Sequence, residues 1–224
     1  MSVSPEAPRT SRTRWLPYAA AAGALVLIAV LVIVFVIKPG GGGSKELSPG
    51  TPAFDFQLVS ATPVTEAEHI KGDPAAVAKK AGDDIRLVLD RMYSLAFLDP
   101  HDWKTGNYAS VFGFFDQGAA SKKAEADAST LTLGPNGSRF SDVQPAGGTL
   151  SVRVLVDEAG TPVSAAAAVE FKARATGSAG SSELVTSKGH YFMHILEGGW
   201  TIFAYSIARN DKPITQPSPT GTAS

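Results

Sequence analysis

Two histidines, His190 and His194, lie four residues apart, a spacing that would place two metal ligands on one face of a helix. The residues around them are aromatic or branched and are bounded by glycines, which favours a strand. In a strand the histidines would be roughly 13 Å apart, with Phe192 between them on the same face, so one metal ion could not bind both. His69 and His101 have no further ligands near them in the sequence. We therefore predict no metal and no cofactor.

Two acidic residues are the next candidates for chemistry. Asp90 follows Arg86 by four residues in a helical pattern, so we expect an exposed ion pair there. Asp102 and Trp103 follow Asp99-Pro100, and we expect Asp102 to cap a helix and Trp103 to join the core. Neither pattern predicts a catalytic residue.

The overall composition excludes some classes of function. The 224 residues carry 20 Lys and Arg against 21 Asp and Glu, and this balance gives no basic surface for nucleic acid. The chain has no cysteine, which excludes disulfides, thiolate metal sites and a cysteine nucleophile. The length suits one folded domain.

An apolar segment near the N-terminus predicts a membrane anchor. Residues 16–37 read LPYAAAAGALVLIAVLVIVFVI without a charged side chain, which is long enough to cross a hydrocarbon core of about 30 Å. More basic residues precede the segment than closely follow it, so the N-terminal arm, residues 1–15, is expected in the cytoplasm and the rest outside the plasma membrane. The basic residues before it are Arg9, Arg12 and Arg14, and those after it are Lys38 and Lys45.

A cleaved signal peptide is the alternative interpretation of this segment. Its apolar run would be shorter, about 7 to 15 residues, and would end at a small-x-small cleavage site. The run in this chain ends in Phe35, Val36 and Ile37 before Lys38-Pro39, which favours an uncleaved single-pass anchor.

The flanks of the exported part predict a tether and a tail. Residues 38–72 begin with KPGGGGS and are expected to form a glycine-rich tether and linker. Residues 211–224 are rich in Pro, Ser and Thr, and we expect a disordered tail. The folded domain is therefore predicted over residues 73–210.

The first half of the domain has a helical pattern. Asp73 and Pro74 form a capping start, and apolar residues then recur three and four apart until about Leu98. Further helices are expected over residues 108–115 and 119–129.

The second half alternates apolar and polar residues, as strands do. Four strands are expected over residues 150–157, 163–174, 184–196 and 200–208, joined by Gly-containing turns. Helices followed by a four-stranded antiparallel sheet predict an α+β fold in which the helices cover one curved face of the sheet.

Several features of this domain together resemble a known family. They are the amphipathic helix, Trp103, the stretch from Leu131 to Gly134, the motifs L-x-V-x-V-L-V-D and G-x-P-x-x-A, and a closing G-G-W-x-I. The pattern resembles the nuclear-transport-factor-2-like (NTF2-like, or cystatin-like) cone found outside an actinobacterial-type membrane anchor. Accessory proteins of mammalian-cell-entry loci and assembly factors of type IV secretion systems share this plan. The resemblance implies a cell-envelope accessory protein, although a shared fold does not supply an activity.

The resemblance also indicates where a ligand or reaction site would lie. Enzymes of this fold, such as ketosteroid isomerase and dehydratase relatives, use ionisable side chains in the mouth of the cone. The matching candidates are Asp90, Tyr93, His101, Asp102, Tyr108 and Asp116. The alanine-rich strand over residues 163–174 either lets helices approach or leaves a hollow for a lipophilic ligand. The expected ligand-binding residues of such a hollow are Phe112, Phe115, Ala167 and Phe171.

Three hypotheses follow for the function. The first is a non-enzymatic envelope protein that docks with partner proteins or with itself near the membrane. The second is a module that binds a small lipophilic molecule in the cone. The third is an isomerase or dehydratase, which requires a buried ionisable group in the same hollow.

Overall fold

The computed structural model describes residues 46–66, 68–177 and 180–214. The predicted anchor over residues 16–37 lies outside the described residues, as do residues 215–224 of the predicted tail. In the described part of the chain, no helix has both the length and the apolar character needed to span a membrane.

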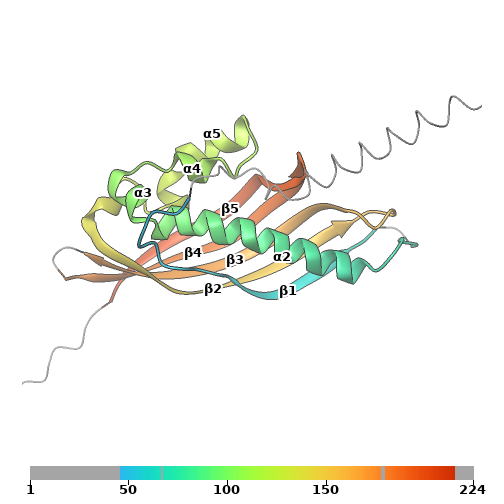
Figure 1. The fold of residues 1–224 in the computed structure, drawn as a ribbon, viewed down its shortest axis with the longest axis horizontal. Helices are drawn as coiled ribbons and strands as arrows, with labels where there is room; N and C mark the ends of the chain where they lie inside the picture. Colours follow the sequence, from blue (N-terminus) through green and yellow to red (C-terminus); the bar gives the residue numbers. More distant parts are fainter. Residues whose placement is uncertain (1–45, 67, 178–179, 215–224) are drawn as a thin grey trace, which may run out of the picture. The chain divides into compact units, whose positions relative to one another are not determined.

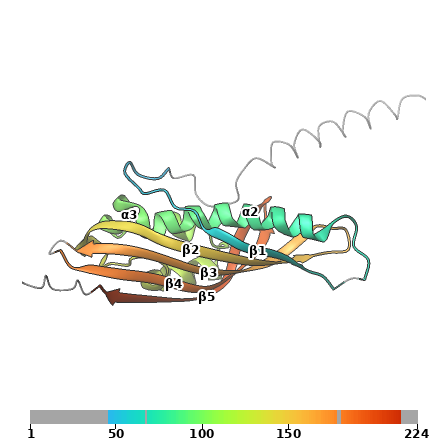
Figure 2. The ribbon, with the colours of Figure 1, turned by 90° about the horizontal axis from the view of Figure 1, so that it is seen from below.

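The described residues form an α+β fold around one mixed sheet of five strands (Figures 1 and 2). The strands lie in chain order across the sheet, β1 pairs in parallel with β2, and the other neighbours are antiparallel. The strands are β1 (Gln57–Val64), β2 (Phe140–Val156), β3 (Pro162–Gly177), β4 (Ser182–Leu196) and β5 (Gly199–Pro213).

The prediction of a four-stranded, purely antiparallel sheet is wrong. Strands β2 to β5 match the four predicted strands in order, but β1 adds a fifth strand from the stretch expected to be linker. Strand β2 begins ten residues before the predicted start at residue 150, and β5 continues through residues 211–213, which were expected to belong to the disordered tail. Phe54, Phe56 and Leu58 alternate with polar or exposed neighbours, and this short pattern marks the approach to β1. The parallel pairing of β1 with β2 requires a long crossover, which the helices between them provide.

Helix α2 (Pro74–Tyr93) begins where the sequence predicts. The Asp73 side chain accepts hydrogen bonds from the backbone N–H groups of Ala75 and Ala76, and Pro74 occupies the first turn. A π-helical turn, η1 (Ser94–Leu98), continues the helix to the predicted end. Figure 2 shows α2 lying along one face of the sheet.

The shorter helices after η1 form a group at one end of the sheet (Figure 1). The helix in the predicted range 108–115 is shorter than expected. The helix predicted over 119–129 is interrupted at Asp127, and its second part continues to Leu131. These elements are α3 (Pro100–Thr105), α4 (Ala109–Phe112), α5 (Ala119–Ala126), α6 (Ala128–Leu131) and the 3-10 turn η2 (Gly137–Arg139).

The core lies between α2 and the face of the sheet that α2 covers, which we call the inner face. Every second residue of β3 from Ala165 to Ala175 is buried on this face, and the intervening residues lie on the opposite, outer face. Helix α2 approaches closely because Gly82 has no side chain: a Cβ there would lie 2.7 Å from the Cβ of Ala61 in β1. Small residues at this contact therefore allow α2 to pack closely against the sheet.

Candidate functional site

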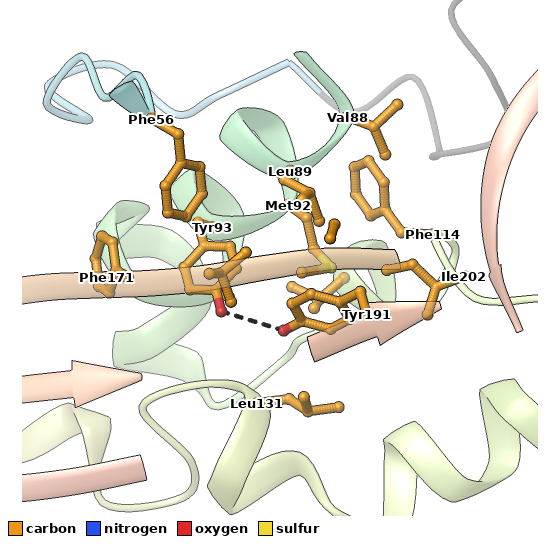
Figure 3. Packing of buried hydrophobic residues seen from close by; sticks show 14 of the residues in the cluster. Phe56, Val88, Leu89, Met92, Tyr93, Phe114, Leu131, Phe171, Tyr191 and Ile202 are labelled. Carbon is orange, nitrogen blue, oxygen red and sulfur yellow. Dashed lines mark hydrogen bonds between the residues drawn. The ribbon is translucent and has the colours of Figure 1, made fainter. Parts of the chain in front are cut away.

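The inner face is filled by aromatic side chains around Phe171. The ring centroid of Phe171 lies 5.0 Å from those of Phe54, Tyr93 and Phe97, and the side chain is fully buried. Figure 3 shows Phe56, Tyr93 and Phe171 grouped beside the helix. Ala167 is also fully buried in this core. The alanines of β3 thus allow close packing between helix and sheet at this position.

Three hydroxyl groups form a polar cluster inside this core. The Tyr93 hydroxyl lies 3.0 Å from Ser187 Oγ and 3.3 Å from the Tyr191 hydroxyl (Figure 3). Burial raises the pKa of Tyr93 to about 12 and also raises the pKa of Tyr191 well above its usual value. Both phenols therefore keep their protons at neutral pH, and the cluster satisfies its own hydrogen bonds.

The predicted ligand-binding residues fall into two places. Phe112 and Phe115 line an open groove of about 690 Å³ beside α4 and α5. Its other lining residues include Asn107, Gln117, Ser121 and Glu125, so the groove is largely polar. Ala167 and Phe171 lie in the packed core and are not among the residues that line this groove.

Asp90 forms the predicted ion pair with Arg86, but the prediction that this pair is exposed is wrong, because Asp90 is buried. Only 6% of Asp90 is exposed, because residues 54–56 lie over it. Its Oδ1 accepts a 2.7 Å hydrogen bond from the backbone N–H of Phe56, and its Oδ2 accepts a 3.0 Å bond from Arg86. Burial is the largest influence and raises the pKa of Asp90 to about 6, although both hydrogen-bond donors oppose it.

This raised pKa gives a prediction for Asp90→Asn. The folded protein holds the Asp90 proton more tightly than the unfolded chain, so this carboxyl contributes stability below about pH 4 that is lost as pH rises through about 6. The measured quantity is the unfolding free energy of the parent protein minus that of Asp90→Asn. We expect this difference to fall by up to about 3 kcal/mol as the pH rises from below about 4 to above about 6. Urea denaturation across this pH range measures it.

Asp84→Asn is the matched control for this measurement. Asp84 lies on the same helix, pairs with Lys80 at 2.7 Å and is exposed. Its substitution should leave the pH dependence nearly unchanged. A parent protein and an Asp90→Asn variant with parallel pH profiles would contradict the assignment.

The other ionisable candidates are scattered. His101 is exposed. Tyr108 lines the same groove as Phe112 and Phe115, and its hydroxyl donates to the carbonyl of Gly134 at 3.3 Å. Asp102 is buried in α3, but the N-cap of that helix is Asp99, so the predicted capping role belongs to Asp99. Asp116 lies 3.5 Å from His194. These side chains do not converge on one hollow.

The histidine pair lies in strand β4, as the sequence predicts. His190 and His194 are on the outer face with Phe192 between them. Within residues 46–66, 68–177 and 180–214, no group of three or more His, Cys, Asp or Glu side chains could hold a metal ion. Trp103 is buried, which confirms its predicted place in the core.

The outer face of the sheet carries the most distinctive surface feature. One apolar residue from each of the five strands contributes to a row across this face, which we call the outer stripe. The register pairs the β1 residue with the β2 residue and the β3 residue with the β4 residue, whereas the β2 and β3 residues lie diagonally across their pair of strands. All five line a shallow hollow of about 290 Å³. The outer stripe consists of Val64, Leu155, Ala166, Phe192 and Phe203.

Two aromatic rings dominate the outer stripe. Phe192 is 39% exposed and Phe203 is 43% exposed, and their ring centroids lie 6.4 Å apart. Arg153 and Ser164 also line the hollow, so a cation lies beside the apolar surface. Further along the outer face, Glu170 pairs with Lys172 and Lys188 at 2.8 and 3.1 Å. The apolar surface is therefore confined to one part of the face.

The outer stripe depends on a β-bulge and was not predicted from the sequence. The register between β4 and β5 shifts after Phe192, so that Phe203 has no direct partner and faces outward with Phe192. A signal was available: Tyr191, Phe192 and Met193 are three consecutive large apolar residues in a strand that otherwise has one wet face. Such a run gives a strand apolar side chains on both faces.

Comparison of the chain with protein-family models, curated protein sequences and solved structures found no significant match. The fold and the surface therefore define the class: an α+β domain with a mixed five-stranded sheet, a filled inner face and an exposed aromatic stripe on its outer face.

Proposed function

We propose that this chain is a membrane-anchored accessory protein of the cell envelope whose α+β domain binds a partner protein through the outer stripe, without catalysis. One observation carries the proposal: Phe192 and Phe203 form an aromatic pair exposed to solvent on the outer face of the sheet. Aromatic residues are enriched at protein interfaces, where they supply large contact areas at low entropy cost.

The chemistry of the outer stripe indicates the kind of partner. The hollow that the two rings help to line accepts an apolar side chain, and Arg153, which also lines it, favours a carboxylate on the same partner. Acidic residues at the nearby turns disfavour an anionic lipid surface, since Asp157 and Glu158 follow β2 and Glu197 follows β4. A protein with an apolar ridge and an adjacent acidic group fits best.

The membrane anchor and the NTF2-like architecture are part of this proposal. The apolar segment over residues 16–37 supports the anchor. One long helix, several short helices and four long antiparallel strands, in that order, support the resemblance. The filled inner face favours interaction over a ligand in the cone, and the scattered ionisable residues favour it over an isomerase or dehydratase.

A site-specific crosslinking experiment tests this function. A photoreactive phenylalanine analogue at Phe192 in the intact chain should crosslink to one discrete envelope protein, and the same analogue at Ser206, on the charged and polar part of the outer face, should not. Phe203→Ser should reduce the yield from Phe192 by about tenfold, as expected when one aromatic anchor is removed from an interface.

The control variant is Leu87→Ser, which changes another exposed apolar residue, on α2. It should leave the crosslinking yield unchanged. Recovery of the uncrosslinked chain alone from intact cells, or equal yields from Phe192 and Ser206, would refute the proposed interaction.

A further inference from the structure

The segment before β1 packs across α2 and its aromatic side chains enter the core. We call residues 47–56 the strap. Phe54 and Phe56 are buried, and their ring centroids lie 4.8 Å apart in an edge-to-face arrangement. Phe54 contacts Phe171 and Phe56 contacts Tyr93, in each case with centroids 5.0 Å apart. The strap therefore covers the aromatic core between α2 and the sheet.

The sheet leaves room for the two rings of the strap at Gly148. A Cβ on Gly148 would lie 2.9 Å from Phe54 Cζ and 2.9 Å from Phe56 Cδ1, closer than real Cβ contacts allow. Gly148 pairs with Phe171 in the β2–β3 register, so it lies directly beneath this cluster. The absence of a side chain at this position forms the slot that the strap occupies.

Two acidic side chains hold the backbone of the strap. Asp90 on α2 accepts from the N–H of Phe56 at 2.7 Å, and Asp99 at the start of α3 accepts from the N–H of Ser48 at 3.0 Å. The charged groups that face Asp90 are Arg86 from α2, at 3.0 Å, and Asp55 from the strap, which lies 3.7 Å from Arg86. The carboxylate of Asp90 is thus buried by the same segment that it binds.

We propose that the strap is a pH-sensitive latch that fills the slot between α2 and the sheet of its own chain. The latch opens locally as Asp90 becomes ionised, and the sheet stays folded. Opening would return Asp90 and Arg86 to water and expose the apolar slot. The ligand class of the open slot is an extended segment with aromatic side chains two residues apart, as Phe54 and Phe56 are in the strap itself.

The sign of the pH effect follows from proton linkage. The closed latch buries Asp90 and raises its pKa to about 6, whereas the open latch exposes a carboxyl with an ordinary pKa near 3.8. The closed state therefore binds the proton more tightly, and a lower pH favours closing. From pH 5 to pH 7 the ratio of open to closed latch should rise about tenfold.

Amide hydrogen exchange of the intact chain in detergent micelles measures this opening. After correction for the intrinsic exchange rate, the Phe56 amide should be protected less than the amides of β3, and its protection should fall about tenfold from pH 5 to pH 7. Asp90→Asn should remove this pH dependence, and Asp84→Asn should keep it. Equal protection at Phe56 and in β3, or a pH dependence that persists in Asp90→Asn, would overturn the proposal.

A second variant tests the slot without changing the strap. Gly148→Ala adds a methyl group where the two rings lie, and it should reduce protection of the Phe56 amide by about tenfold or more while β3 remains protected. The apolar dye 8-anilinonaphthalene-1-sulfonate should then bind this variant and show higher fluorescence than with the parent protein. Loss of protection throughout β3 would overturn the latch, because strap and sheet would then unfold as one unit.

Discussion

Replacing Phe171 with alanine is expected to lower the free energy of unfolding by about 3–5 kcal/mol. The Phe171 ring is fully buried and contacts Phe54, Tyr93 and Phe97 at once, so its removal leaves a cavity between the sheet, the helix and the strap. The surrounding strands cannot collapse into that cavity without losing their register. Urea denaturation followed by circular dichroism measures the loss.

The result distinguishes a core residue from a wall of a ligand cavity. Lys172→Ala, the next residue along β3, removes an exposed side chain and should change the unfolding free energy by less than about 0.5 kcal/mol. A Phe171→Ala variant as stable as Lys172→Ala would mean that the ring borders open space, and it would revive the hypothesis of a lipophilic ligand in the cone.

Gly189→Ala is expected to have the second large effect, a loss of about 3 kcal/mol or more. Gly189 has φ of 153°, a conformation that side chains disfavour, and a Cβ there would lie 2.0 Å from the Ser206 carbonyl oxygen and 2.9 Å from Ile207 Cα on β5. Both obstacles are backbone atoms, so the two strands would have to separate. Thermal unfolding and the yield of folded protein report the effect.

Gly147→Ala separates the two causes of this loss, which are backbone strain at positive φ and the steric clash with β5. Gly147 also lies in a strand and has φ of 119°, but nothing lies within 4 Å of a Cβ at that position. Its substitution should cost only the backbone strain, about 1 kcal/mol. Equal losses at the two glycines would show that the close approach of β5 to Gly189 contributes nothing.

The inner face of the sheet, its outer face and the strap are built from different residues. The inner face holds α2 and the aromatic core, and the outer stripe exposes Phe192 and Phe203 to solvent. The strap lies over the edge of the core, and Asp90, whose pKa is raised, binds its backbone. Binding at the outer stripe and opening of the strap therefore use different residues, and their variants can be tested independently.

The start of α2 and the order of the four long strands were predictable because their signals are local. Asp73 and Pro74 define a helix start through backbone hydrogen bonding, and alternation along β3 defines a strand with one wet face. Strand β1 was missed because it is shorter than the other strands, contains Pro63 and pairs in parallel with a strand that begins more than 70 residues later. Its stabilisation comes from α2 and β2, which no local pattern reports.

The sequence by itself determined the apolar segment at residues 16–37, the α+β class, and the burial of alternate residues on β3, since these follow from hydrophobic length and period. Only the tertiary structure decided which residues meet. It buried Asp90 beneath the strap, placed Ala167 and Phe171 in a filled core away from the groove that Phe112 lines, and turned Phe203 outward beside Phe192 at a bulge. Burial of a charge and the pairing of distant strands depend on contacts between segments far apart in the chain, and those contacts set the candidate sites.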